Sequence, residues 1–514
     1  MKPVSPVWCL PLVSAALLAQ SNPCPGGARP FEMGSAPSWN GWSPDGSNAR
    51  FQPADGAQIP VDQVGKLHLK WAFGFPDAKA VLGAPAIAGG RVFLGVDTGT
   101  VYSLDAATGC LYWSFQAGGG VRSAVTVERI GARTLAFFGD LKANAYAVDA
   151  ATGELAWKAH IEEHPRALIT AAPKVFEGRV YVPVASGEEG AGVNPNYPCC
   201  TFRGSVVALD AATGRELWKT FTIADVPKQI GKNSNGVARW TPAGGGVWNS
   251  PTIDAQRRVL YVGTGDAYTE PAPSTTDSIL AIDLATGKIV WSVQDTENDA
   301  WLVGCNGAKP PENCPKTLGP DHDFGASPIL KKLGDGRTLL IAGQKSGNVW
   351  AHDPDHKGAM VWRTALVNNT TEFGGKIVWG GAADDRNAYF GLGPGGIAAV
   401  GLRDGERQWF TALPPAPAVA SHPGQDGALS AMPGVVFSGG FDGVLRALDS
   451  GSGRVLWEYD TVREFETVNG VAAKGGSLSV AGPTVAGGML FAGSGYVGVR
   501  NGMPGNVLLA FSWR

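Results

Sequence analysis

One sequence unit recurs along most of the chain, and this repetition constrains the fold more than any other feature. The unit is clearest in residues 91–115, RVFLGVDTGTVYSLDAATGCLYWSF, and in residues 135–159, LAFFGDLKANAYAVDAATGELAWKA. Further copies begin near residues 178, 258, 338, 387 and 434. A unit this short cannot bury its apolar face alone, so the pattern predicts a repeat architecture in which neighbouring units pack on one another.

The pattern inside each unit is typical of antiparallel β-strands. Apolar residues alternate at Val92, Leu94 and Val96, and the Asp-Ala-Ala-Thr-Gly segment supplies a tight turn. The Trp that follows the turn is predicted to pack one unit against the next. The tryptophans in this position are Trp113, Trp157, Trp218, Trp291, Trp362, Trp409 and Trp457.

The last unit is incomplete, which predicts how the array ends. Residues 488–514 supply three strands, and the missing fourth is available around Trp71 in VGKLHLKWAFGF. Pairing the two ends would close a ring and remove the exposed sheet edges. We therefore predict an all-β fold, an eight-bladed β-propeller with Trp-docking motifs whose ring is closed by N- and C-terminal strands. Functional residues are expected on the loops at one end of the central channel.

Composition agrees with a large folded core and excludes some partners. Hydrophobic residues make up 44% of the 514 positions, with 72 Gly and 17 Trp, which argues against disorder. The formal net charge is −3, so no global positive field indicates nucleic-acid binding.

The N-terminus, MKPVSPVWCLPLVSAALLAQS, has one Lys, an apolar run and then small residues. We interpret residues 1–20 as a secretory signal peptide cut near Ala19 to Ser21, the alternative being a frayed cytosolic tail. The run is too short and too interrupted by Pro for a good membrane span. Residues 21–514 would then form a single exported propeller domain, periplasmic or secreted.

Six cysteines follow that segment, an even number that favours disulfides in an oxidising compartment. Cys305 and Cys314 bracket a Pro-rich loop that a local bridge would close, whereas the pairing of Cys24 with Cys110 stays open. The adjacent Cys199 and Cys200 could be two buried thiols, halves of two disulfides, or bonded to each other.

Several motifs resemble those of the pyrroloquinoline quinone (PQQ)-dependent alcohol dehydrogenases. They include GWSPDGSNARFQPADGAQIPVDQVGKLHLKWAF before the ring, TGCLYWSFQAGGGVRSAVTV, YPCCTFRGSV and DFGASP. The resemblance extends from about Ser38 to Arg514 and is strongest to the members that oxidise polyvinyl alcohol. Trp docking alone is weak support, because non-enzymatic outer-membrane assembly lipoproteins share it.

The resemblance implies a Ca²⁺ ion beside PQQ. VPVASGEEGAG would make Glu189 a metal ligand, with its neighbour Glu188 as the rival, and YVGTGDAYTEP would make Asp266 the second. GPDHDFGASPIL would make Asp323 both a metal ligand and the catalytic base, and leave Asp321 solvated. Hard oxygen donors of this kind suit Ca²⁺.

The same resemblance implies residues that hold the quinone. Trp248 would stack beneath PQQ, Thr170 would form a hydrogen bond, Arg122 would bind a carboxylate and Lys345 would contact the quinone oxygens as a further catalytic residue. The other residues expected near the quinone are Ser186, Gly187 and Glu188, together with Cys199 and Cys200 as a vicinal disulfide facing the channel opposite Trp248.

Three features depart from the family pattern, and a fourth position bears on which metal is bound. Leu82 stands where many members carry an acidic residue, and the adjacent cysteines fall one blade later than usual, just before Arg203. An insertion at residues 302–320 interrupts the approach to Asp323. Gly325 occupies the place where lanthanide-using members add an Asp, so calcium is favoured. The substrate mouth is therefore expected to be unusual.

The implied activity is oxidation of secondary alcohol groups, in polyvinyl alcohol or a related polyol, to ketones. Asp323 would accept the hydroxyl proton, and Lys345 would stabilise the charge that develops. The sequence has no Cys-x-x-Cys-His haem motif, so a soluble cytochrome c is the expected electron acceptor. The alternatives are a PQQ dehydrogenase for small primary alcohols or sugars, and a non-enzymatic propeller scaffold for binding or assembly.

Overall fold

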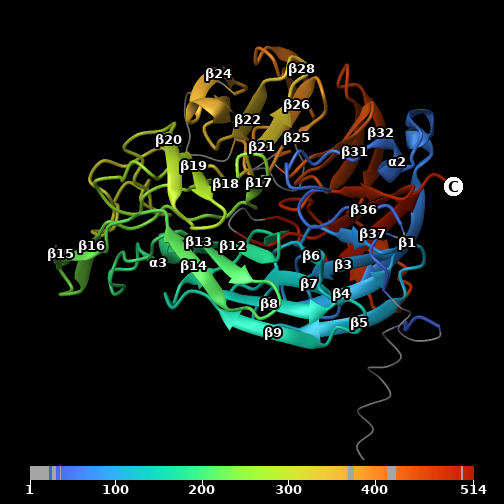
Figure 1. Cartoon of the computed structure of the whole chain (residues 1–514), viewed down its shortest axis with the longest axis horizontal. Helices are drawn as coiled ribbons and strands as arrows, with labels where there is room; N and C mark the ends of the chain where they lie inside the picture. The colour runs from blue at the N-terminus through green and yellow to red at the C-terminus, as the bar shows by residue number, and fades with distance from the viewer. Residues whose placement is uncertain are drawn as a thin grey trace, which may run out of the picture.

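Eight antiparallel sheets follow one another around the molecule in chain order, seven with four strands and the third with a fifth short strand (Figure 1). The computed structural model describes residues 22–25, 31–34, 36–367, 376–413, 424–425, 427–498 and 502–514, so the expected signal peptide at residues 1–20 lies outside the described residues. In this part of the chain no helix is long and apolar enough to cross a membrane. The predicted eight-bladed β-propeller is confirmed.

Each blade runs from an innermost strand at the channel to an outermost strand at the rim. The first four blades are β2 (Ala86–Ala88), β3 (Arg91–Gly95), β4 (Thr100–Asp105) and β5 (Leu111–Gln116); β6 (Thr126–Ile130), β7 (Arg133–Gly139), β8 (Asn144–Asp149) and β9 (Leu155–His160); β11 (Lys174–Phe176), β12 (Arg179–Ser186), β13 (Ser205–Asp210) and β14 (Glu216–Phe221); and β17 (Thr252–Asp254), β18 (Val259–Gly263), β19 (Ser278–Asp283) and β20 (Ile289–Gln294).

The remaining four blades follow the same order. They are β21 (Ile329–Lys332), β22 (Thr338–Gly343), β23 (Asn348–Asp353) and β24 (Ala359–Ala365); β25 (Ala382–Ala383), β26 (Asn387–Gly391), β27 (Ile397–Gly401) and β28 (Arg407–Thr411); β29 (Ser430–Met432), β30 (Val435–Gly439), β31 (Val444–Asp449) and β32 (Val455–Asp460); and β35 (Thr484–Ala486), β36 (Met489–Ser494), β37 (Val507–Ser512) and β1 (His68–Gly74). Because β1 pairs with β37, the ring closes as predicted.

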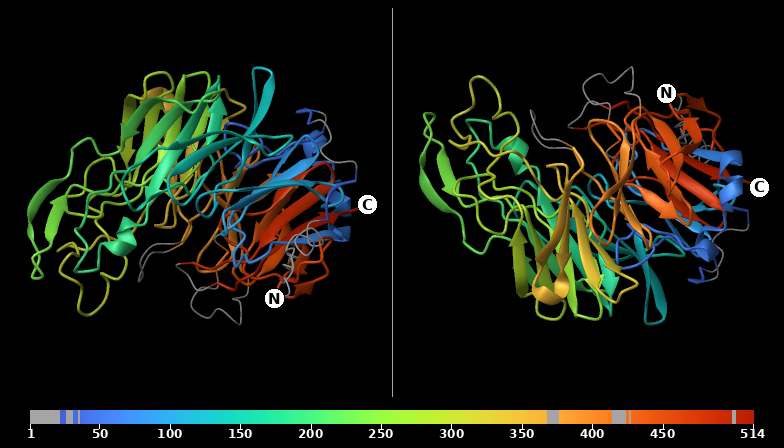
Figure 2. Two further views of the ribbon diagram at one scale, coloured as in Figure 1. Left: turned by 90° about the horizontal axis from the view of Figure 1, so that it is seen from below. Right: turned by 90° about the horizontal axis from the view of Figure 1, so that it is seen from above.

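Short elements decorate this ring. They are β10 (Ala167–Leu168), which pairs with β12, the hairpins β15 (Lys228–Lys232) with β16 (Ala238–Thr241) and β33 (Glu464–Phe465) with β34 (Ala473–Lys474), the α-helices α2 (Ala54–Ala57) and α3 (Glu188–Ala191), and the 3-10 helices η1 (Val61–Lys66) and η2 (Pro354–His356). The β15–β16 hairpin protrudes at the side of the ring away from the C-terminus (Figures 1 and 2).

The tryptophans of the repeat join adjacent blades. The indole N–H of Trp113 donates to the carbonyl of Ala150 in the next blade, and the same bond recurs at Trp157, Trp218, Trp362, Trp409 and Trp457. Trp71 on β1 makes it to Ala106 and so joins the eighth blade to the first. The ring of Trp113 also lies against Gly153, where an added Cβ would approach it to 2.7 Å. The turn Gly is therefore required for the indole to dock.

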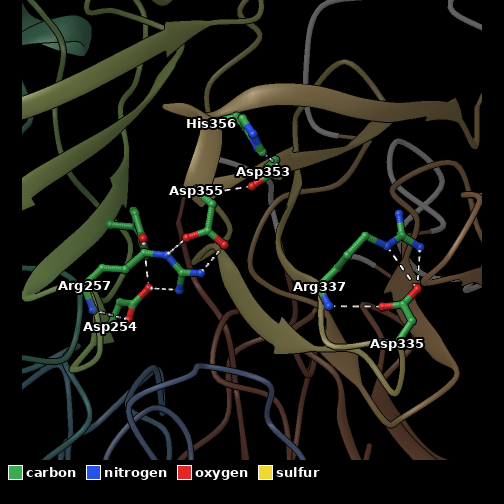
Figure 3. A network of polar contacts seen from close by, with 8 residues as sticks. Asp254, Arg257, Asp335, Arg337, Asp353, Asp355 and His356 are labelled. Atoms are coloured by element: carbon green, nitrogen blue, oxygen red, sulfur yellow. Dashed lines mark hydrogen bonds and ion pairs between the residues drawn. The ribbon is translucent and has the colours of Figure 1, made fainter.

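Ion pairs between side chains also connect neighbouring blades (Figure 3). Arg257, just after β17, donates to Asp254 of its own blade at 2.8 Å and to Asp355 in η2 of the next blade at 2.8 and 2.6 Å. By contrast, Arg337 pairs with Asp335 inside one exposed turn. Only the first of these networks links two blades.

The N-terminal segment, residues 39–52, contacts the innermost strand of every blade in blade order. Its hydrogen bonds join Trp39 to Ile87, Asn40 to Val127, Asp45 to Lys174, Gly46 to Ile253, Ser47 to Leu330, Ala49 to Ala383, Arg50 to Ala431 and Gln52 to Val485. Within it, Trp42 packs among Ala84, Ala124, Ala172 and Ala481, which come from the loops that lead into four of the blades. The segment thus fills part of the channel that the ring encloses.

Arg50 is the cationic residue of this segment. Its side chain is 0% exposed and donates to the carbonyls of Trp42, Leu429, Ala481 and Pro483, while its guanidinium lies 4.4 Å from the Trp42 ring. Burial lowers the pKa of Arg50 to about 9, which leaves it charged at neutral pH. The fork of donors therefore holds the segment to the seventh and eighth blades.

We expect Arg50→Lys to lower the free energy of unfolding by about 3 kcal/mol, because a single ammonium cannot satisfy carbonyls arranged around a guanidinium. The measurement is the midpoint of urea denaturation. Arg337→Lys, in the exposed turn, is the matched control and should leave that midpoint unchanged. Equal midpoints for both variants would contradict a role for Arg50 in closing the channel.

Candidate functional site

A cavity of about 420 Å³ opens among the loops at one end of the channel. Two kinds of loop reach it: those that enter a blade and those that join its second strand to its third. Arg122, Thr170, Trp248 and Asp323 come from the first kind, and Asp266 from the second. Because both kinds lie at the same end of a propeller blade, side chains far apart in sequence converge there.

Eight of the predicted site residues line this cavity. They are Arg122, Thr170, Ser186, Glu189, Trp248, Asp266, Asp323 and Lys345. Four others are not among its described lining residues. They are Gly187, Glu188, Cys199 and Cys200.

Asp323 and Lys345 form the centre of the polar half. Lys345 Nζ donates to Asp323 Oδ2 at 2.8 Å and to Asp321 Oδ1 at 2.5 Å, and its backbone N–H donates to the Asp323 carbonyl at 3.0 Å. The other carboxylate oxygen of Asp323 accepts from the backbone N–H of Asp266 at 2.7 Å. Asp323 is only 4% exposed, so these contacts fix its orientation within the cavity wall.

Asp321 is thus not the solvated neighbour that the sequence predicted. Its side chain is 16% exposed and bound to Lys345. The reason lies in its loop, where the buried carboxylate of Asp299 accepts from the backbone N–H groups of Asp321 and His322 at 3.1 and 2.7 Å. These two bonds hold the loop so that Asp321 faces the cavity.

Burial in the polar half disfavours the charged forms of its carboxyl groups. Burial, aided by Asp321 and Asp323 and opposed by Lys345, raises the pKa of Glu189 to about 8. Burial and the charges of Asp323 and Glu189 raise the pKa of Asp266 well above its ordinary value. Burial lowers the pKa of Lys345, but the surrounding carboxylates outweigh it and keep the pKa well above its usual range. Lys345 therefore stays cationic at neutral pH.

Glu188 and Glu189 have separate roles, although both begin α3. Glu188 is 0% exposed and accepts from the backbone N–H groups of Thr201 and Phe202 and from the hydroxyl of Tyr197. Its own N–H donates to Ser186 Oγ. Glu188 therefore supports the loop behind the cavity, while Glu189 faces into it.

The aromatic half of the cavity is built around Trp248. Gly325 packs against its ring so closely that an added Cβ would lie 1.9 Å from Trp248 Cη2. Trp379 meets Trp248 edge to face at 5.4 Å between ring centroids, and the Arg122 guanidinium lies 4.4 Å from the Trp379 ring. Burial lowers the pKa of Arg122 to about 10, so it remains a cation at neutral pH.

Several buried polar atoms of the cavity wall have no hydrogen-bond partner among the described residues. They are Arg122 Nε, Thr170 Oγ1, Trp379 Nε1 and Asp266 Oδ2. Buried polar groups are nearly always satisfied, and an orphaned set facing one cavity indicates a ligand that would satisfy it. Three donors and one acceptor suit a ligand with anionic oxygens on one side and a cation on the other.

Cys199 and Cys200 form the expected vicinal disulfide, across a cis peptide bond, and neither residue is among the described residues that line the cavity. Both residues are buried in a hydrophobic cluster with Leu302, Phe202 and Tyr268. An added Cβ at Gly192 would lie 2.9 Å from Cys199 Sγ and 3.1 Å from Cys200 Sγ. The disulfide therefore packs against Gly192, which follows α3, and against Leu302 at the start of the 302–320 insertion.

The other two disulfides lie away from Trp248. Cys24 bonds to Cys110, a pairing that the sequence left open, and fastens residues 22–25 to the first blade. Cys305 bonds to Cys314 as predicted. This second bond closes the insertion, whose first residues include Val303 of the cavity mouth.

Sequence reasoning missed four aromatic residues of the wall, Tyr268, Trp301, Trp379 and Tyr496. Trp301 and Trp379, like Trp248, lie outside the docking position of the repeat. That same departure could have singled them out.

Comparison with known proteins agrees with this site. Residues 39–305 match the family model described as glucose/ethanol/alcohol dehydrogenase, beta-propeller domain, and residues 393–511 match that of outer membrane protein assembly factor BamB. The second match falls after the last predicted site residue, where the docking repeats dominate.

The polyvinylalcohol dehydrogenase of a Pseudomonas species is 40% identical over 530 residues, which cover 98% of this chain and 81% of that protein. The polyvinylalcohol dehydrogenase of Sphingopyxis sp. (strain 113P3) is 40% identical over 521 residues, or 95% and 78% of the two chains. Among solved structures, the quinohemoprotein alcohol dehydrogenase ADHIIG of Pseudomonas putida HK5 superposes with a TM-score of 0.71 at 18% identity, covering 93% of this chain and 80% of that one. This last likeness concerns the fold alone.

We expect Gly325→Ala to displace the Trp248 ring, because the new Cβ and the indole cannot occupy the same space. Overpacking of this kind costs about 1–3 kcal/mol. Near-UV circular dichroism should change and the urea midpoint should fall. Gly334→Ala, in an exposed turn with no atom within 4 Å of the new Cβ, is the control and should change neither. An unaltered near-UV spectrum for Gly325→Ala would show that the wall is not tightly packed there.

Proposed function

The chain belongs to the family of PQQ-dependent alcohol dehydrogenases, and we propose that it oxidises secondary alcohol groups of polyvinyl alcohol, or of a related polyol, to ketones. In this proposal PQQ and a Ca²⁺ ion occupy the cavity, and a soluble cytochrome c receives the electrons. The observation that carries the proposal is the convergence of eight predicted site residues on one cavity.

The aromatic half of the cavity fits PQQ. Trp248 offers a flat face held by Gly325, and the orphaned donors of Arg122 and Thr170 would bind oxygens of an anionic ring system. The volume of about 420 Å³ lies within the range of small-molecule sites. We propose these three residues, with Ser186, as the quinone-binding set. Gly187, Glu188, Cys199 and Cys200, which the family resemblance also implies near the quinone, are not among the described residues that line the cavity.

The polar half fits a hard cation. Glu189, Asp266 and Asp323 are the metal ligands that the family resemblance implies, and Asp266 Oδ2 lacks a hydrogen-bond partner. Carboxylate oxygens are the donors that Ca²⁺ prefers. An Asp at position 325, which would favour a lanthanide, would collide with Trp248, and this supports calcium.

Asp323 is the proposed base. Its carboxylate is held by the Asp266 N–H and the Lys345 ammonium, so an alcohol hydroxyl placed in the cavity would meet an oriented proton acceptor. Lys345 would stabilise negative charge that develops near it. PQQ, when bound, supplies the two-electron acceptor for the hydride of the alcohol. The buried aromatic wall would exclude water from this exchange.

The mouth of the cavity supports an apolar alcohol over a sugar. Val303 and Val497 are 41% and 38% exposed there, and Leu82 replaces an acidic residue. A carbon chain with a hydroxyl group on every second carbon would place its methylene groups against these side chains. This is the observation that favours polyvinyl alcohol or a similar polyol.

We expect purified apoprotein, given PQQ and Ca²⁺, to reduce an electron-accepting dye with secondary alcohols and polyvinyl alcohol. Asp323→Asn should lower kcat by about 100-fold or more while it retains PQQ, because loss of a general base costs 10²–10⁴-fold. Dye reduction with primary alcohols alone would overturn the polymer substrate. Absence of both quinone absorbance and dye reduction would overturn the whole proposal. Cytochrome c reduction in place of the dye tests the acceptor.

We also propose that residues 1–20 are removed on export. The three disulfides support an oxidising compartment. The mass of the protein secreted by a bacterial host should correspond to an N-terminus near residues 20–22. A mass that includes Met1 would contradict this.

A further inference from the structure

Three carboxylates of the cavity lie together, and they are not the three that the family resemblance selects. Glu189, Asp266 and Asp321 each present an oxygen, and these oxygens lie within 4.8 Å of one another. Asp266 is 2% exposed, and its Oδ2 has no hydrogen-bond partner among the described residues. A buried carboxylate oxygen without a donor is costly unless a ligand satisfies it.

Asp323 is engaged differently. Its Oδ1 accepts from the Asp266 N–H at 2.7 Å, and its Oδ2 accepts from Lys345 Nζ at 2.8 Å. It does not join the group of clustered oxygens in the described part of the chain. The hydrogen bonds to Asp323 therefore orient it beside the cluster rather than within it.

Lys345 alone does not neutralise the cluster. It forms ion pairs with Asp321 and Asp323, whereas Glu189 and Asp266 have no cationic group within 4.0 Å among the residues described. Like charges at such separations repel strongly where water is scarce. A multivalent cation between the three carboxylates would remove this repulsion, and their oxygens are the donors that Ca²⁺ takes.

The backbone holds Asp321 in place for this role. Asp299 accepts from the N–H groups of Asp321 and His322, and Gly319 lies so close that an added Cβ would be 2.1 Å from Asp299 Oδ1. The loop of the insertion therefore reaches the cavity in one arrangement.

We propose that Asp321 is the third carboxylate ligand of the metal ion, together with Glu189 and Asp266, and that Asp323 acts as the base without ligating it. This inference rests on the proposed function, which makes Asp323 both a metal ligand and the base. It assigns the ligand role to Asp321 and leaves the base role to Asp323. The ligand class is a hard divalent cation of the size of Ca²⁺.

Calorimetric titration of Ca²⁺ into chelator-treated protein, without quinone, tests the assignment. Asp321→Asn should raise the Kd for Ca²⁺ by about tenfold or more, since ligand charge sets affinity at such sites. Asp323→Asn should change that Kd by less than about threefold, because its oxygens serve Lys345 and the Asp266 N–H instead. Asp62→Asn, which removes one exposed negative charge, is the control for net charge and should leave the Kd unchanged.

The outcomes separate the inference from the function on which it rests. Unchanged affinity in Asp321→Asn, with weakened affinity in Asp323→Asn, would overturn the inference and leave the proposed function intact. Failure of the wild-type protein to bind Ca²⁺ would overturn the calcium part of both. Urea midpoints within experimental error of the wild type, together with binding of Asp321→Asn at higher Ca²⁺, would exclude misfolding as the cause of a raised Kd.

Discussion

The docking of one indole on one glycine turn, repeated around the ring, is the contact on which the rest of the structure depends. Trp113 against Gly153 is the pattern, and Trp71 against Gly109 repeats it where the eighth blade meets the first. Each indole spans two sheets that share no backbone pairing, so its hydrogen bond and its packing set the angle between them. The loops at the channel then converge without any single blade holding a complete site.

Because its residues come from several blades, the site is divided into two chemically different halves. The second to sixth blades provide aromatic and cationic groups on one side and carboxylates on the other, so neither half exists within a single repeat. Lys345 is the link between them, since it bonds to Asp323 and lies 5.3 Å from the centroid of the Trp248 ring. Charged groups fixed in this way would stabilise the charge that develops in the proposed hydride transfer.

The blades could be predicted from the sequence because their signals are local. Alternating apolar residues and the Asp-Ala-Ala-Thr-Gly turn specify strands and turns within a few residues, and a recurrent Trp specifies how they stack. Site residues such as Glu189 and Trp248 were predicted from the resemblance of their motifs to those of the family, and not from the repeat.

Contacts between different blades could not be predicted from the sequence. The place of Cys199 and Cys200 depends on Leu302, and the place of Asp321 depends on Asp299, which are remote in sequence but pack together in the fold. Sequence periodicity carries no information on which way a loop side chain turns. The role of residues 39–52 was hidden for the same reason, because each of their partners lies in a different blade.

Residues 39–52 also determine the order in which the fold can be completed. They are made among the first residues of the chain, yet Gln52 finds one of its partners at Val485, 433 positions later. Contacts of such long range are slow to form, and the strands awaiting them stay open to misplaced pairing. The channel can therefore be completed only after the last blade has been made.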